Sequence, residues 1–372
     1  MGFISQNLLR LFLLCLVGND NKKLFVIFEE RKRKIMYSKC KEEVLELISI
    51  SESNQGKMHI ITVFDDPYKV EAASGMIFPI EISDVEAGFS FASTYYTGYK
   101  DYFSFKKDVE ENKFSDPNIK YLVYSTSQIG IDIDRRSYVP ILCKEKGISL
   151  LTCDAYHLGL LMDKSHYFSL LNVFSHIPHT LTYFGQANFE NTIKSSYVIL
   201  KPALECAAIG VTKVKNENQI IMPLLSEMQK EYNQKILVQE YIEGYEISVP
   251  VLEKRGQYIS TPPVWVKFNG EILTYNMVDD FQYSFSVLPC TEFPYNKIIT
   301  EVCKHAEKVM QFVGSKGLSR VDYRIKNETE FYIFDIAALP VLADTGTCAQ
   351  SFKALFGNSE SMFQSIIGSC LC

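Results

Sequence analysis

The stretch YVILKPALECAAIGVTKVKN, residues 197–216, decides how the rest of the chain is interpreted. Residues 198–200 favour a buried β-strand, which places Lys201 where that strand emerges. Pro202 blocks a helix, and residues 203–210 are mostly small. Backbone N–H groups of such a loop approach phosphate closely, and the lysine supplies the opposite charge. The alternative is a β-hairpin with an exposed lysine, and these residues taken alone favour it.

Length and composition indicate an ordinary globular protein. A chain of 372 residues is long enough for two or three domains. Its 47% hydrophobic and 22% charged fractions exclude a disordered or coiled chain. The net charge of -6 argues against a nucleic-acid partner, and we interpret the basic run at 30–34 as a solvated connection.

The cysteines and the N-terminus indicate in which compartment of the cell the protein is expected. Ten cysteines include no CxxC pair, and the six histidines do not join them at metal-ligand spacing, so we expect reduced thiols and a cytoplasmic protein. Cys370 and Cys372 are expected to be free thiols rather than a disulfide. The apolar residues 8–17 are too few to span a bilayer and lack a cleavage signal, so a packed or frayed helix is favoured over a signal peptide.

From residue 24 the hydrophobic pattern is α/β. It predicts strands followed by helices, with residues 67–117 as a long excursion without clear period, helical at most over 107–113. A first domain closes near Asp154. The predicted strands are 24–28, 59–64, 121–125 and 149–152, and the predicted helices are 41–50 and 135–146.

The second half of the chain predicts one long amphipathic helix followed by two antiparallel units. That helix covers 158–173. The remaining predicted elements are strands at 180–184, 197–202, 236–242, 247–252, 262–268, 319–325 and 331–336, helices at 224–233 and 298–313, and two short C-terminal helices. The pattern divides the chain into an apolar extension, 1–22, and domains at 23–154, 155–235 and 236–372.

Four stretches in order resemble the ATP-grasp ligases of the D-alanine:D-alanine ligase type. They are Met162-Asp163-Lys164, the strand and loop around Lys201, LVQEYIEGYEISV at 237–249, and GLSRVDYRIKNETEFYIFDIAALP at 317–340. The resemblance covers residues 150–368 well and the first domain only in outline. It implies a pre-ATP-grasp domain, a small central subdomain and a C-terminal sheet subdomain, with ATP between two sheets.

The resemblance also implies a nucleotide site. Lys164 and Lys201 match the lysines on the phosphates, and Glu246 matches the acid at the ribose. The loop would offer backbone donors to phosphate, and the strand between the subdomains would hold the adenine edge through its backbone. These implied contacts come from Ala207, Ala208 and Gly210 in the loop and from Glu240, Tyr241 and Ile242 in the strand.

The final predicted hairpin carries the metal argument. Asp322 and Asp335 fall on adjacent strands, where both carboxylates can face one way and gather Mg²⁺, with Mn²⁺ possible, beside phosphates. Arg320 shares that face and matches the family arginine that supports charge at the tetrahedral centre. A salt bridge between Arg320 and one of the aspartates is the alternative.

Departures from the family pattern concern the substrate more than ATP. Ala337 replaces the asparagine of the family Glu-x-Asn, and Cys206-Ala207-Ala208 replaces Gly-Ser-Ser. Asp279-Asp280 stands where the family tends to bring a lysine, and residues 29–31 replace a glutamate-bearing segment. The resemblance thus implies an unusual ligase for an amino-acid or peptide substrate, working through an acyl phosphate, with a homodimer as the family habit. The alternative is an ATP-binding protein without turnover, a pseudoenzyme or regulatory subunit.

Overall fold

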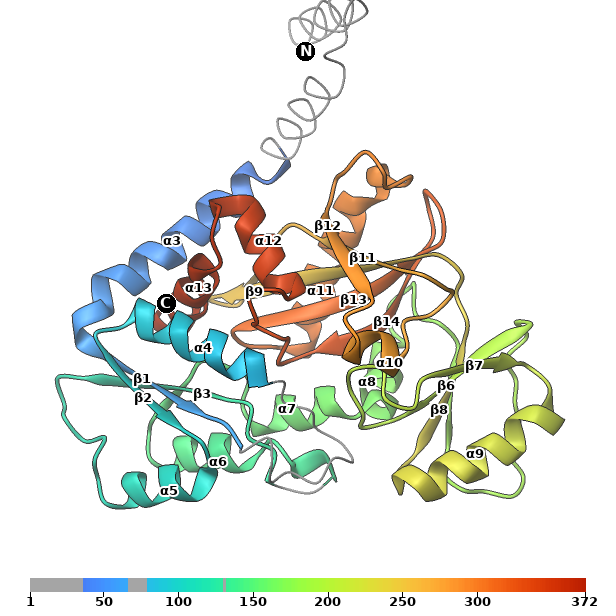
Figure 1. The fold of residues 1–372 in the computed structure, drawn as a ribbon, viewed down its shortest axis with the longest axis horizontal. Helices are drawn as coiled ribbons and strands as arrows, with labels where there is room; N and C mark the ends of the chain where they lie inside the picture. Colours follow the sequence, from blue (N-terminus) through green and yellow to red (C-terminus); the bar gives the residue numbers. More distant parts are fainter. Residues whose placement is uncertain (1–35, 66–78, 130–131) are drawn as a thin grey trace, which may run out of the picture.

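The structure is a computed structural model that describes residues 36–65, 79–129 and 132–372. The predicted strand at 24–28, the apolar segment 8–17 and the basic run at 30–34 lie outside these residues. Within them the chain forms three β-sheets with helices packed around them (Figure 1). No helix in these ranges is long and apolar enough to cross a membrane. The nine cysteines they contain, Cys370 and Cys372 among them, are free thiols.

The first sheet is parallel, with strand order β2-β1-β3-β4. Parallel strands need helical crossovers, and a ligand site is expected beyond their carboxyl ends. The elements are α3 (Ser38–Asn54), η1 (Gln55–Lys57), β1 (Met58–Val63), α4 (Pro79–Ala92), β2 (Tyr95–Tyr99), α5 (Tyr102–Glu110), β3 (Lys120–Ser125), η2 (Asp132–Asp134), α6 (Tyr138–Glu145) and β4 (Ser149–Leu150).

Treating 67–117 as an irregular excursion was wrong for its described part, which forms α4, β2 and α5. The helix α4 is apolar along most of its length, so its sequence lacks the one-sided pattern on which helix prediction depends. Its Phe89 is fully buried against Phe363 of the C-terminal helix, with ring centroids 5.0 Å apart. Tertiary packing, rather than a local pattern, therefore defines this segment.

The second sheet is small and antiparallel, with order β5-β8-β6-β7 and α9 over one face (Figure 1). Its elements are β5 (Thr180–Tyr183), β6 (Tyr197–Pro202), β7 (Thr212–Lys215), α9 (Asn218–Tyr232) and β8 (Ile236–Glu240). The predicted start of α9 at residue 224 was wrong because Pro223 resembles a helix boundary, yet here it lies inside the helix.

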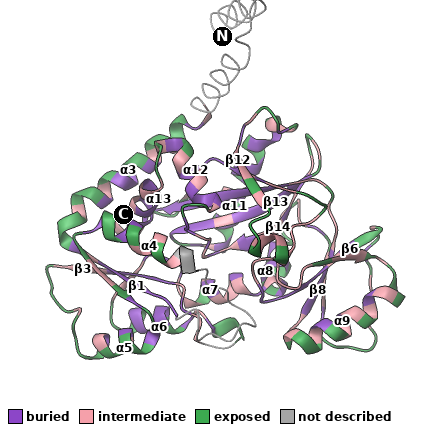
Figure 2. Ribbon diagram, viewed as in Figure 1, coloured by how far each residue is buried: buried purple, intermediate pink, exposed green. Residues whose placement is uncertain are grey.

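The third sheet has order β12-β11-β9-β13-β14, with β10 paired to β9. In Figure 2 its central strands β9 and β13 are largely buried, and the helix α11 buries one of its faces. The elements are β9 (Tyr245–Lys254), β10 (Gln257–Ser260), β11 (Val264–Phe268), α10 (Tyr275–Asp279), β12 (Tyr283–Val287), η3 (Asn296–Ile298), α11 (Ile299–Val313), β13 (Leu318–Ile325), β14 (Phe331–Ala337), α12 (Thr347–Phe356) and α13 (Glu360–Leu371). Of these, β10, α10 and β12 were not predicted.

The predicted single helix at 158–173 is two helices, α7 (Ala155–Met162) and α8 (Lys164–Leu171). The break is Asp163, whose extended backbone and side chain cap α8 by accepting from the amides of Ser165 and His166. A capping residue of this kind ends one helix and starts the next without changing the apolar period. The break places Lys164 at the first position of α8.

The first and third sheets share one hydrophobic core, which also contains residues of α3, α12 and α13. At Gly368 in α13, an added Cβ would lie 2.0 Å from the carbonyl oxygen of Leu47 in α3, so only glycine permits this close packing. The N-terminal and C-terminal parts of the described chain are therefore joined. The domain boundaries at 154 and 235 stay predictions.

Candidate functional site

A cavity of about 400 Å³ is lined by residues of the second and third sheets and by loops of the first. It gathers residues that are distant in sequence. Of the predicted site residues, Gly210 alone is outside its lining; the others are Lys164, Lys201, Ala207, Ala208, Glu240, Tyr241, Ile242, Glu246, Arg320, Asp322 and Asp335. The structure thus brings the predicted set together, while the role of each residue stays a prediction.

Lys201 is the residue before the last in strand β6 and is only 5% exposed. The strands β6 and β7 do form a hairpin, but the exposed lysine of the alternative was wrong. Its Nζ donates to Gln239 Oε1 at 2.9 Å and to the carbonyl of Phe334 at 2.8 Å. Burial disfavours the charged amine and lowers the pKa of Lys201 to about 7, although Asp335 opposes the shift. Both hydrogen-bond acceptors of Lys201 are neutral, so a bound anion would stabilise the charged form of this buried amine.

Lys164 points to the same region from the start of α8. Its Nζ donates to the carbonyl of Glu205, and its backbone amide donates to the carbonyl of Ala203 at 3.0 Å. Burial opposes ionisation of Asp335, but Lys164 and Lys201 outweigh it and hold the pKa of that carboxyl below its usual value. Two cations and one carboxylate therefore share this part of the cavity.

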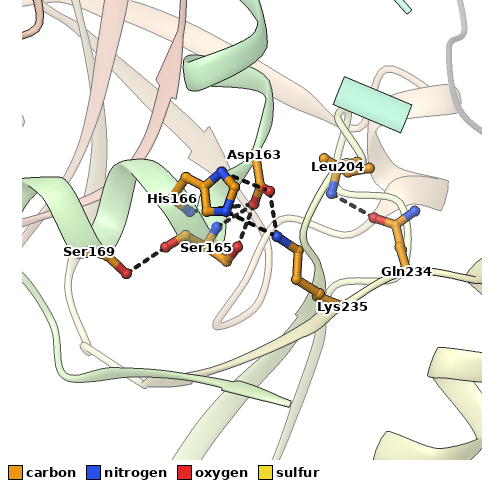
Figure 3. Close-up of polar contacts among 7 residues, drawn as sticks. All are labelled: Asp163, Ser165, His166, Ser169, Leu204, Gln234 and Lys235. Atoms are coloured by element: carbon orange, nitrogen blue, oxygen red, sulfur yellow. Dashed lines mark hydrogen bonds and ion pairs between the residues drawn. The ribbon is translucent and has the colours of Figure 1, made fainter. Parts of the chain in front are cut away.

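The loop after Lys201 is anchored at its start. The amide of Leu204 donates to Gln234 Oε1 at 2.6 Å (Figure 3), and the carbonyl of Leu204 accepts from Arg135 Nη2 at 2.7 Å. Gln234 Nε2 also donates to Glu205 Oε1 at 2.7 Å. These anchors could not be predicted from the sequence, because Arg135 and Gln234 lie far from the loop along the chain.

Ala207 and Ala208 form the turn that faces the cavity, with φ of 53° and 59°. Both are in the left-handed region, which is unfavourable for residues with a Cβ. Gly210 has φ of 70°, and a Cβ there would lie 2.6 Å from Pro202 Cγ, so this glycine shapes the loop without lining the cavity. The loop offers its backbone to a ligand in place of the serine hydroxyls it lacks.

Asp163 centres a buried polar cluster beside this loop (Figure 3). Its carboxylate accepts from Lys235 Nζ and from Ser165 Oγ, both at 2.6 Å, and His166 Nδ1 lies 3.3 Å away. Burial opposes ionisation, but Lys235 and Ser165 outweigh it and lower the pKa of Asp163. The cluster joins the start of α8, which carries Lys164, to the residue that precedes β8.

Asp322 and Asp335 are direct cross-strand partners on β13 and β14, as predicted. The predicted alternative for Arg320 is also present: its Nε and Nη2 donate to Asp322 at 2.8 and 2.7 Å. Ser248 Oγ donates to Asp322 at 2.7 Å, and Tyr167 Oη donates to Asp335 at 2.6 Å. Arg320 thus donates to both carboxylate oxygens of Asp322.

The two carboxylates suit Mg²⁺, which is usually bound by one or two carboxylates together with phosphate oxygens and water. Among the described residues there is no group of three or more His, Cys, Asp or Glu side chains that could hold a metal. A bound ion would therefore need ligands beyond the protein. Ala337, the cross-strand partner of Arg320, also lines the cavity and offers no ligand atom.

Glu246 belongs to a group of ion pairs and hydrogen bonds that the sequence did not predict. We call this group, Glu246, Arg324, Glu271 and Lys213, the clasp. Glu246 is buried on β9, where Arg324 Nη2 donates to its Oε1 at 2.6 Å. Arg324 also donates to the carbonyl of Glu271 at 3.0 Å, and Lys213 Nζ donates to Glu271 Oε1 at 2.8 Å while lying 3.8 Å from the ring centroid of Tyr241. The clasp ties the loop that follows β11 to the strand predicted to hold adenine.

Burial raises the pKa of Glu246, and Arg324 opposes that shift. Glu246 is the residue that the prediction assigns to the ribose. Asp279 and Asp280 do not line the cavity in the described chain, whereas the neighbouring Phe281 does. The two aspartates therefore stand in place of the lysine of the family pattern, and neither adds an acid to the lining of the cavity.

The architecture and this cavity define an ATP-grasp fold. A D-alanine–D-alanine ligase from Bacillus anthracis complexed with ATP aligns with a TM-score of 0.62 over 84% of this chain and 97% of that chain, at 17% identity. The VanG D-Ala:D-Ser ligase from Enterococcus faecalis aligns with a TM-score of 0.60 over 83% and 98%, also at 17% identity. These likenesses show the fold.

Sequence comparison finds similarity to the same class of ligases. Residues 185–368 match the family model described as D-ala D-ala ligase C-terminus, and the predicted relationship to ATP-grasp ligases of the D-alanine:D-alanine ligase type is confirmed. The D-alanine–D-alanine ligase of Glaesserella parasuis is 32% identical over 46% of this chain and 53% of its own length. That of Finegoldia magna is 29% identical over 48% and 50%. The chain spans about half the length of these curated relatives.

Proposed function

We propose that this protein is an ATP-dependent ligase that joins a carboxylate to an amine as an amide. The single observation that carries the proposal is the convergence of Lys164, Lys201, Asp322 and Asp335 on one cavity. Cations for polyphosphate and carboxylates for Mg²⁺ are the groups that phosphoryl transfer needs, and no covalent enzyme nucleophile is required.

ATP supplies the phosphoryl group that activates the carboxylate as an acyl phosphate, and the amine then displaces phosphate. The chain contributes position and charge. Lys164 and Lys201 hold the phosphates, and Lys201 regains full positive charge when an anion enters its buried site. The backbone of residues 240–242 holds adenine, Glu246 accepts from the ribose, and the turn at Ala207 and Ala208 contacts phosphate.

Asp322 and Asp335 are the residues that would hold Mg²⁺ or Mn²⁺, and such an ion would supply positive charge to the phosphates. Arg320 pairs with Asp322 and also lines the cavity, where its guanidinium would stabilise charge developing at the reacting carbon.

The second candidate function is an ATP-binding protein without turnover, and a specific observation favours it. Ala337 and the turn Cys206-Ala207-Ala208 lack ligand and hydroxyl groups that the family pattern has. Against this alternative, the lysines and aspartates that the reaction needs all line one cavity. We propose that the protein works in the cytoplasm as a homodimer on amino-acid or peptide substrates.

The deciding experiment incubates the protein with ATP, Mg²⁺ and a panel of D- and L-amino acids, then measures phosphate release and product mass. A ligase gives a product mass equal to the sum of two substrates minus water, with one phosphate per product. Asp322→Asn is the matched control and should release none. Nucleotide binding by calorimetry without product for any pair would establish the non-catalytic alternative.

A further inference from the structure

Helix α8 contacts or supplies three of the charged groups that line the cavity. It begins with Lys164, which lines the cavity itself. Tyr167 follows one turn later, and its Oη donates to Asp335 Oδ1 at 2.6 Å. The ring centroid of Phe168 lies 4.8 Å from Lys201 Nζ. Residues three and four positions apart share one side of a helix, so this one short helix serves all three charges.

Tyr167 is fully buried and does not line the cavity. Its ring packs against that of Phe168, with the centroids 4.8 Å apart, and its backbone amide donates at 3.1 Å to the carbonyl of Asp163, the residue that caps α8. A phenol has one proton to donate, and here that proton goes to Asp335. Tyr167 can therefore influence a ligand in the cavity only through the carboxylate of Asp335.

The two carboxylate oxygens of Asp335 have different surroundings. Oδ1 accepts from Tyr167 Oη at 2.6 Å and from the backbone amide of Ile336 at 3.0 Å. In the part of the chain that the structure describes, no hydrogen-bond donor reaches Oδ2. Two donors on one oxygen fix the rotation of the carboxylate group, and Asp335 lines the cavity. Asp335 therefore presents a single oxygen, Oδ2, in a fixed direction.

Asp322, the cross-strand partner of Asp335, has no such free oxygen. Arg320 donates to both of its oxygens, and Ser248 Oγ donates to Oδ1 at 2.7 Å. A cation that enters between the two strands therefore meets one acid whose oxygens are already hydrogen-bonded and one acid with an oxygen to offer. The direction in which Asp335 points thus decides whether the cavity offers a carboxylate oxygen without a protein partner.

We propose that Tyr167 is a positioning residue, which holds Asp335 with Oδ2 turned towards the cavity for a divalent cation. Partners that hydrogen-bond to a metal ligand orient it, and their loss weakens metal binding. This inference rests on the Mg²⁺ site of the proposed function and adds to it a residue that lies outside the cavity. Because Tyr167 and Lys164 belong to the same helix, α8 aligns the metal-binding acid with a cation for the phosphates.

The test is calorimetry of the full chain with a non-hydrolysable ATP analogue, measured once with excess Mg²⁺ and once with EDTA. The ratio of the two dissociation constants gives the gain in affinity that the ion provides. Tyr167→Phe removes only the hydroxyl, and Asp335 Oδ1 keeps the amide of Ile336, so no buried group loses its last partner. This variant should lose about tenfold or more of the gain, the usual effect of losing a partner that orients a metal ligand. Its affinity in EDTA should stay within about twofold of the wild type, because the lysines that face the phosphates are unchanged.

Tyr258→Phe is the matched control. The hydroxyl of Tyr258 donates to the carbonyl of Ser315 at 2.9 Å, and this tyrosine does not line the cavity. The control therefore also removes one hydrogen-bonded tyrosine hydroxyl, yet it leaves the partners of Asp335 in place. Its gain in affinity from Mg²⁺ should equal that of the wild type.

Four results would overturn the proposal. The first is a wild-type affinity that Mg²⁺ does not change, and the second is a Tyr167→Phe variant that keeps the whole gain. The third is an equal loss of affinity with Mg²⁺ and with EDTA, and the fourth is the same loss of gain in Tyr258→Phe. A gain that Tyr167→Phe loses, without turnover of any substrate, would refute the ligase function and support this inference. Turnover together with an unchanged gain would do the reverse, so the two failures are distinguishable.

Discussion

Binding of ATP should take up a proton at Lys201, and this is the sharpest consequence of the site geometry. The free amine is buried, which lowers its pKa to about 7 although Asp335 opposes the shift. Phosphate oxygens beside Nζ favour the ammonium form and raise that pKa. The protein with bound nucleotide therefore holds more protons than the free protein wherever the pH exceeds about 7.

The size of the proton uptake follows from the pKa of Lys201 in the protein without nucleotide. With a pKa of about 7, roughly nine-tenths of Lys201 is neutral at about pH 8, so each nucleotide bound there takes up about 0.9 proton. The dissociation constant should rise by up to tenfold for each pH unit above about 7, until the pKa of the complex is reached. Below about pH 6 the dependence on Lys201 should vanish, because the amine is already protonated.

Titration calorimetry measures this uptake directly. A non-hydrolysable ATP analogue with Mg²⁺ is titrated near pH 8 in two buffers of different ionisation enthalpy, and the difference in observed heat gives the protons exchanged. Lys201→Arg is the matched variant, because a guanidinium stays charged and its uptake should fall towards zero. An uptake below about 0.2 proton in the wild type, or an unchanged uptake in Lys201→Arg, would refute the reasoning.

Three further outcomes are expected. Ala337→Asn should lower the Mg²⁺ needed for half-maximal turnover by about tenfold, since it restores an oxygen ligand; an unchanged magnesium dependence would show that Ala337 is not a lost ligand. Arg324→Met should raise the KM for ATP about tenfold with little change in kcat, because it leaves the buried Glu246 without its counter-ion; equal loss of kcat would contradict a role confined to nucleotide binding. Asp163→Ala should lower the free energy of unfolding in urea by about 2–3 kcal/mol, because α8 loses its cap and Lys235 its partner, and a loss under about 0.5 kcal/mol would show that the cluster is not stabilising.

The parts of the fold that the sequence predicted well are those whose burial alternates or is continuous over a short run. Strand β6 and the hairpin of β13 and β14 belong to this group, and that hairpin places Asp322 and Asp335 together because paired strands fix their register. The break at Asp163 escaped prediction because the apolar period runs through it. The helix α4 escaped because apolar residues, Phe91 among them, also lie on its exposed side and obscure the helical period.

The candidate site divides in the same way. Residues on strands or at helix starts could be placed from spacing, whereas their partners come from segments that only the tertiary fold brings near. Arg324 reaches Glu246 across 78 residues, and Arg135 reaches Leu204 across 69. The first pair are cross-strand partners on β13 and β9 of one sheet, and the second joins two loops that the fold brings together, so no periodicity in the sequence encodes either pair. The residues that anchor the loop after Lys201 could therefore not be predicted from the sequence.

The energetically unfavourable features of this cavity help to decide whether the protein still binds a ligand there or has lost that function. Lys201 is buried with a depressed pKa, and the two alanines of the turn lie in the left-handed region, where each non-glycine residue costs on the order of 1 kcal/mol. A chain that had lost its ligand would gain stability from replacing Lys201 by an apolar residue and from relaxing that turn. Instead, the loop is anchored by Arg135 and Gln234, and the charges at Asp335 are balanced by two lysines. Strain and buried charge that neighbouring residues hold in place are expected where a polyphosphate binds. We therefore expect that the nucleotide site is retained, and that the missing hydroxyls and the missing metal ligand alter its phosphate and metal contacts.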